Sequence, residues 1–312
     1  MVRLILTLNL LLSFFSFQSQ ENNLDWILKI MKNQSSDSYE LLMMYKELPQ
    51  ELSYSTIDGG TISSEKSTSA FSYLDLSSKK STLRSMSLNV HEICHGLTAT
   101  YFFKEMKNNY IPHQFEDIKS YFFISNNIKI TSIFKGKVFP SIEINSMIPS
   151  EMKTFRYDTY IEGNSSTQDE GIIGLLDEFN AYYHDSKFTF DMFELYKLIY
   201  PNDYLNMWVM ELQSEMTAFF EFDYWIKEYL LFAKENYPKL FVEIMEKSQA
   251  FKIYKKIYFN YSALLSDYSK KVSIEKNNIE YRYSSEFWID DYNKLINQLS
   301  KSRYESINLY LN

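Results

Sequence analysis

The part of the chain from residue 191 to 312 is one predicted helix after another. Apolar side chains recur there at three- and four-residue spacing, with breaks near Pro201, Pro238 and Asn277. This spacing is typical of helices that bury one face. The whole chain of 312 residues contains only 7 Gly and 6 Pro. So few turn-forming residues favour long regular elements over a turn-rich all-β sandwich.

The first half of the chain shows a mixed pattern. Residues 21–48 predict one or two helices, and the Ser- and Thr-rich residues 52–84 predict a loop or a weak hairpin. Residues 85–107 predict a long helix, and residues 171–184 predict another. Between these two helices, residues 121–139 alternate and are rich in β-branched and aromatic side chains, which predicts two or three short strands.

The first 20 residues differ from the rest of the chain. Arg3 precedes an apolar run from Leu4 to Phe17. This run is shorter than the roughly 20 apolar residues that a membrane span needs. Residues 1–20 therefore predict a signal peptide and a secreted or periplasmic protein with no transmembrane segment after its removal. The alternative is a buried N-terminal helix.

Charge and cysteine content exclude two classes of protein. The net charge of −8 and the absence of a dense basic stripe predict no nucleic-acid partner. Cys94 is the single cysteine, so an intramolecular disulfide is impossible. We expect Cys94 to be a small core residue that faces away from the metal site considered next. A thiolate ligand or a redox switch is the alternative.

The segment "NVHEICHGLTATYFF" at residues 89–103 carries the strongest chemical signal. His91 and His95 are four residues apart on a predicted helix, so their side chains lie on one face. Zinc of the catalytic type takes three protein ligands and keeps a fourth position for water. Glu92 adjoins the first histidine, which is the position of a general base in such sites. Gly96, directly after the second histidine, would let another backbone approach the metal. The alternative is a buried helix with two hydrogen-bonded core histidines.

The residues after the motif restrict the third ligand. An extended His-Glu-x-x-His-x-x-Gly-x-x-His site would need Gly at 98 and His at 101, and this chain has Thr98 and Tyr101. The segments "HEICH" and "GLLDEFNAYYH" instead resemble the gluzincin group of zinc metallopeptidases. That resemblance implies a Glu from a later helix as the third ligand, with residues 121–145 as a β-rich insertion between the two helices.

We predict Glu178 as this ligand because it lies in a strong helical pattern, with Ala181 and Tyr182 on the same face of the helix. Glu116 is closer to the spacing usual in the group but lies in a short polar piece after Pro112. The remaining candidates for the third ligand are Asp177, His113 and Glu170. Candidates for stabilising an oxyanion beside the metal are Arg156, Tyr160, Tyr182, Tyr183 and His184.

Together, these features predict an α+β, predominantly α-helical protein. The resemblance implies a zincin-like catalytic core with a small β-sheet over residues 21–190. A helical region of residues 191–312 is expected to pack on this core and to form one wall of the cleft. It implies Zn²⁺ as cofactor and a peptide or protein as substrate, which the strands at 121–139 would bind by edge addition unless they form only a packing sheet. The alternative function is that of a non-catalytic secreted helical binding protein.

Overall fold

The computed structural model describes residues 20–55, 59–102, 104, 120–124, 127–130, 138–163, 166–276 and 286–311. Apart from residue 20, the predicted signal peptide lies outside this part. The described chain is predominantly helical, as expected. None of its helices is both long enough and apolar enough to span a bilayer.

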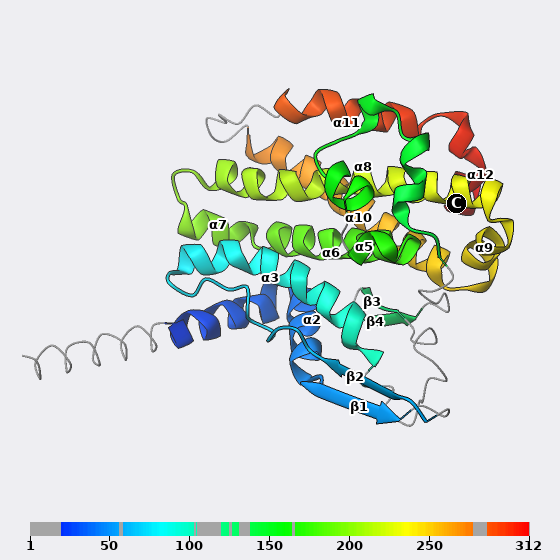
Figure 1. Cartoon of the computed structure of the whole chain (residues 1–312). Helices are drawn as coiled ribbons and strands as arrows, with labels where there is room; N and C mark the ends of the chain where they lie inside the picture. Colours follow the sequence, from blue (N-terminus) through cyan, green and yellow to red (C-terminus); the bar gives the residue numbers. More distant parts are fainter. Residues whose placement is uncertain are drawn as a thin grey trace, which may run out of the picture.

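Three long helices form the centre of the molecule. They are α3 (Lys79–Thr100), α6 (Ile172–Asp191) and α8 (Tyr204–Asn236), with α6 packed between the other two (Figure 1). A fourth long helix, α10 (Ala250–Glu275), packs on both α6 and α8. Helix α11 (Glu286–Leu299) lies on the side of α8 opposite α6. Buried aromatic and aliphatic side chains fill the space between these helices.

The N-terminal part packs against α3. Residues 20–34 are helical, and α2 (Ser36–Glu47) follows and contacts α3. An antiparallel hairpin of β1 (Glu51–Ser55) and β2 (Thr61–Glu65) then occupies part of the predicted loop or weak hairpin.

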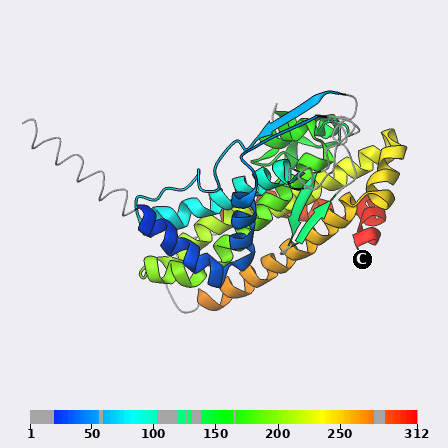
Figure 2. The ribbon, with the colours of Figure 1, turned by 90° about the horizontal axis from the view of Figure 1, so that it is seen from below.

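A second hairpin pairs β3 (Tyr121–Ile124) with β4 (Asn127–Ile130), which confirms two of the predicted strands. Strand β3 is fully buried against α3, α6 and α10, and Figure 2 shows the hairpin beside α10. The predicted β-rich insertion over residues 121–145 is wrong at its end. Ser141–Met147 forms a 3₁₀ helix, and residues 131–137 lie outside the described part.

The backbone of β3 takes part in packing. The carbonyl of Phe123 accepts hydrogen bonds from Asn180 Nδ2 at 3.1 Å and from His184 Nε2 at 2.9 Å, both on α6. Side chains of the neighbouring helix therefore occupy a backbone acceptor that an added substrate strand would need. This arrangement favours the packing-sheet alternative for β3 over substrate binding at its edge.

The remaining elements are short. The predicted breaks near Pro201 and Pro238 are confirmed, because α7 ends before Tyr200 and Pro238 is the first residue of α9. The third predicted break, at Asn277, lies outside the described part. The short helices are α5 (Ser166–Asp169), α7 (Phe193–Ile199), α9 (Pro238–Val242) and α12 (Glu305–Leu311). Single 3₁₀ or π turns cover Ser150–Met152, Asp158–Glu162, Glu243–Lys247 and Ser302–Tyr304.

The core is continuous across the predicted boundary at residue 190. That boundary falls in the last turn of α6, and one buried hydrophobic cluster extends from Ile27 to Leu311. Helix α6 contacts α3 on one side and α8 on the other. Side chains of α6 that face α3 therefore project from a helix that is packed on both sides.

Candidate metal centre

Helix α3 presents the two motif histidines to α6. The helix starts at Lys79, six residues before the predicted start, because the Ser78 hydroxyl caps it by accepting from the Ser81 N–H at 3.1 Å. Beyond this cap the helix continues without interruption through the motif to Thr100. His91 and His95 therefore lie one turn apart on one face.

Three side-chain atoms converge between α3 and α6. His91 Nε2 and His95 Nε2 are 3.1 Å apart. Glu178 Oε2 lies 3.3 Å from His95 Nε2 and 3.7 Å from His91 Nε2. A tetrahedral zinc ion with bonds of about 2.0–2.2 Å separates its ligand atoms by about 3.4 Å. The three atoms are thus spaced as the ligands of one zinc ion would be.

The hydrogen bonding of Glu178 leaves one oxygen directed at the histidines. Oε1 accepts a hydrogen bond from the Thr167 hydroxyl of α5 at 3.2 Å. Oε2 is buried and faces the two histidine Nε2 atoms, and among the described residues it has no hydrogen-bond partner apart from a protonated histidine. A buried carboxylate costs free energy, which protons on the histidines or a metal cation between the three side chains would offset. The donor set therefore fits a zinc ion.

Two further carboxylates of α6 orient the imidazoles. Asp185 Oδ2 lies 2.9 Å from His91 Nδ1, and Asp177 Oδ2 lies 2.7 Å from His95 Nδ1. Each carboxylate accepts the Nδ1 proton, so the lone pair of each neutral ring is on Nε2, the atom that faces Glu178. Metal-binding histidines commonly have such a partner behind the ring. Sequence reasoning missed Asp185, although it lies two helical turns after Glu178 on the same face.

The electrostatics of the cluster favour a positive charge. Burial lowers the pKa of His95, but Asp177 and Glu178 outweigh burial and raise it well above its ordinary value. Burial also lowers the pKa of His91, and Asp185 and Glu178 reverse that effect. For Glu178, burial raises the pKa, but the two histidines dominate and hold it well below its usual range. Three carboxylates around two imidazoles thus favour binding of protons or of a metal cation.

We expect zinc affinity to fall as the pH is lowered, and to keep rising above pH 7. The raised pKa values of His91 and His95 mean that protons occupy the metal-free rings above their ordinary titration range. Zinc must displace these protons. The measurement is zinc affinity against a competing chelator from pH 6 to 9, with proton release followed by calorimetry in two buffers. An affinity that is constant over this range would contradict the expectation.

Replacing Asp185 with asparagine should weaken zinc binding about 10–100-fold, the range typical of such orienting partners. Asparagine keeps the size of the side chain but no longer attracts the Nδ1 proton of His91 as a carboxylate does. Zinc affinity by competition titration provides the measurement. Asp191→Asn, one to two turns further along α6 and paired with Lys187, is the matched control and should leave the affinity unchanged.

Glu92, the predicted general base, is half-buried on α3 directly after His91. It takes part in none of the ion pairs found within the described ranges. Its carboxylate is therefore not committed to a structural partner in the way that Asp177 and Asp185 are.

Two of the candidates for oxyanion stabilisation lie close to the cluster. The Tyr182 ring is 4.6 Å from the His91 ring, and its hydroxyl lies 3.0 Å from that of Tyr160. The position of Tyr182 on the face of Glu178 was predicted and is confirmed. Burial and the charge of Glu178 raise the pKa of Tyr160, so this phenol keeps its proton and can donate a hydrogen bond.

Arg156 is linked to the cluster through Tyr182. Its guanidinium carbon lies 4.6 Å from the Tyr182 ring centre. It also forms a buried ion pair with Glu221 of α8 at 2.7 Å, so its charge is already neutralised. The arginine thus holds Tyr182 between α6 and α8.

The remaining two candidates serve packing. His184 Nε2 donates to the Phe123 carbonyl, and the ring of Tyr183 packs against His184 and Tyr261. Burial lowers the pKa of His184 to about 4, so this ring is neutral. Neither side chain belongs to the group of ligand atoms.

The remaining candidates for the third ligand do not join this group. Asp177 contacts the Nδ1 side of His95, away from the converging Nε2 atoms. Glu170 lies outside the ligand group formed within the described residues. Glu116 and His113 lie outside the described part.

Cys94 is a buried core residue, as predicted. Its Sγ accepts a hydrogen bond from Asn180 at 3.2 Å. The predicted role of Gly96 in admitting another backbone near the metal is wrong. A Cβ at position 96 would lie 2.8 Å from the ring of Tyr45, so the glycine accommodates a side chain of α2.

Comparisons with protein-family models, curated proteins and solved structures find no match to this chain. The resemblance to gluzincins therefore stays a prediction from the two motif segments.

Proposed function

We propose that this chain is an exported zinc-dependent peptidase of a divergent, gluzincin-like kind with a zincin-like core. In this proposal His91, His95 and Glu178 hold the zinc ion, and Glu92 is the general base. The observation that carries the proposal is the convergence of three ligand atoms at the spacing of a tetrahedral zinc site.

Each residue has a role that follows from its position. Bound zinc supplies Lewis acidity, which lowers the pKa of water to about 7. Glu92 then takes a proton from the attacking water and passes it to the leaving amine. Asp185 and Asp177 keep both imidazoles in the tautomer that directs Nε2 at the site.

Tyr160 is proposed as a hydrogen-bond donor to the substrate carbonyl oxygen as it gains negative charge. Its hydroxyl is held by that of Tyr182, which Arg156 supports from behind. Arg156 is itself held by an ion pair with Glu221, which lies on α8. The predicted contribution of the C-terminal helical region to the cleft is consistent with this contact.

The parts of the proposal have different support. The ligand geometry supports a metal centre with a base beside it. The choice of peptide or protein as substrate follows the gluzincin resemblance of "HEICH" and "GLLDEFNAYYH". Export to the periplasm or outside the cell follows from the composition of residues 1–20.

The alternative function, a non-catalytic helical binding protein, would be favoured if His91 and His95 did not share a metal position with a carboxylate. Glu178 lies close to both histidines, and two carboxylates orient the rings, which supports the metal centre over this alternative.

The experiment is an assay of the purified mature chain on a library of quenched fluorescent peptides. We expect cleavage that stops with a zinc chelator and returns on addition of stoichiometric zinc. A chain that holds one zinc ion per molecule but cleaves no peptide in the library would contradict the substrate class. A chain whose cleavage persists in the chelator would contradict the zinc chemistry.

A further inference from the structure

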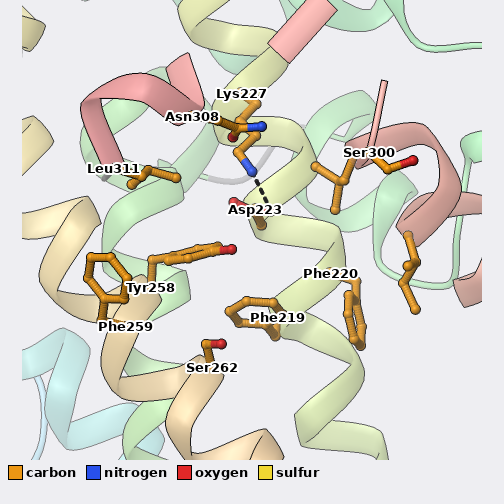
Figure 3. A pocket seen from close by; sticks show the side chains of 12 residues that line it. Phe219, Phe220, Asp223, Lys227, Tyr258, Phe259, Ser262, Ser300, Asn308 and Leu311 are labelled. Atoms are coloured by element: carbon orange, nitrogen blue, oxygen red, sulfur yellow. Dashed lines mark hydrogen bonds and ion pairs between the residues drawn. The ribbon is translucent and has the colours of Figure 1, made fainter. Parts of the chain in front are cut away.

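A second candidate site lies apart from the metal centre. Helices α8, α10, α11 and α12, with Ser300 at the end of α11, surround a pocket of about 470 Å³ (Figure 3). The metal ligands lie between α3 and α6, whereas this pocket lies among α8 and the helices that pack on it. Its volume is within the range of about 300–1,000 Å³ that small-molecule sites occupy.

Four aromatic side chains line one part of the pocket. Phe219 and Phe220 come from α8, and Tyr258 and Phe259 come from α10. Among the lining residues, Phe259 is 46% and Ile296 41% exposed, and the polar Ser300 is exposed as well. An apolar molecule that enters the pocket would remove the exposed apolar surface from water, which favours binding.

A buried ion pair supplies the polar group. Lys227 Nζ lies 2.9 Å from Asp223 Oδ2, and both side chains are 3% exposed. The other oxygen of Asp223 accepts a hydrogen bond from the Tyr254 hydroxyl. Both oxygens of Asp223 are thus engaged. Within the described part of the chain, Asp223 is the one hydrogen-bond acceptor of Lys227 Nζ, which also lies 5.4 Å from the centre of the Tyr258 ring. An ammonium carries three N–H donors.

The charges in the pocket restrict the ligand. Lys227 and Asp223 are the charged side chains in its wall, and they neutralise each other. A ligand carboxylate would be repelled by Asp223, and a ligand ammonium would be repelled by Lys227. Because Lys227 offers donors, the complementary group is an uncharged hydrogen-bond acceptor.

We propose that this pocket binds an uncharged, largely apolar small molecule whose carbonyl or hydroxyl oxygen accepts a hydrogen bond from Lys227. The aromatic rings contact the body of the ligand, and the ion pair fixes its polar end. This site is separate from the metal centre and does not depend on the proposed peptidase activity.

The test uses the uncharged ketone 6-propionyl-2-(dimethylamino)naphthalene, whose emission shifts to the blue in apolar surroundings. We expect saturable binding to the full chain. Ser262→Trp places a large side chain in the pocket and should weaken binding about tenfold or more. Ser266→Trp, one turn further along α10 and exposed, is the matched control and should bind as the wild type does. Equal affinity of all three proteins, or no saturable binding to the wild type, would overturn the proposal.

The role of Lys227 is tested with a double variant, Asp223→Asn with Lys227→Met, which leaves no buried charge unpaired. Affinity for the ketone should fall about tenfold, as expected for a lost charge-assisted hydrogen bond. Affinity for 2-ethylnaphthalene, which has no acceptor and is measured by displacement of the ketone, should change much less. An equal loss for both molecules would overturn the assignment of Lys227.

Chelation of zinc should leave binding of the ketone to the wild type unchanged. Loss of binding on chelation would contradict the independence of the two sites.

Discussion

Replacing Glu178 with glutamine is expected to weaken zinc binding more than a hundredfold, beyond the 10–100-fold typical of residues that only orient a ligand. Glutamine keeps the size of the side chain and the acceptor for Thr167. It removes the negative charge that faces both Nε2 atoms. The measurements are metal content after dialysis and zinc affinity by chelator competition.

Two matched variants separate this result from the remaining candidate ligands. Glu170→Gln, just before α6, and Glu116→Gln should both retain stoichiometric zinc. Zinc lost in the Glu116 variant and kept in the Glu178 variant would contradict the ligand set. The melting temperature of each zinc-free variant, compared with that of the zinc-free wild type, identifies any loss that comes from unfolding.

Glu92→Gln should keep zinc and lose hydrolysis. Glu92 is the proposed base and has no place among the three ligand atoms. General-base catalysis contributes about 10²–10⁴-fold, so kcat/KM on a cleaved peptide should fall by about that factor. Zinc content and zinc affinity should remain close to those of the wild type. The measurement is peptide cleavage at equal zinc occupancy of the two proteins.

Loss of zinc in the Glu92 variant would make Glu92 a ligand and contradict its assignment as the base. Unchanged cleavage at full zinc occupancy would show that another group takes the proton. Leu88→Ala is a control on the same helix, since Leu88 is exposed on α3 and outside the ligand group. It should alter neither zinc content nor cleavage.

Helical periodicity predicted much of the candidate site. The four-residue spacing of His91 and His95 and the strong pattern around Glu178 are local features of the sequence. The structure brings these three side chains together from helices whose ligands are more than 80 positions apart. The periodicity also placed Tyr182 on the correct face. Helical periodicity could not predict the pairing of Asp185 with His91. This pairing depends on the antiparallel alignment of α3 and α6, which is a tertiary contact.

The rest of the fold depends on contacts that a local pattern does not contain. The buried pair of Arg156 and Glu221 joins residues 65 positions apart in the chain. The 3₁₀ helix Ser141–Met147 follows Pro140 and falls largely within the end of the expected β-rich insertion, and no local pattern predicted it. The Lys227–Asp223 pair is visible as a four-residue spacing, but its burial beside aromatic rings follows only from how α8, α10, α11 and α12 pack.

The measurement that tests the central claim most directly is an anomalous-scattering map at the zinc edge from crystals of the chain grown with zinc. The proposed site predicts one strong peak at about 2.0–2.2 Å from His91 Nε2, His95 Nε2 and a Glu178 carboxylate oxygen. A peak bound by other side chains, or no peak between α3 and α6 in a folded chain, would contradict the proposed metal centre.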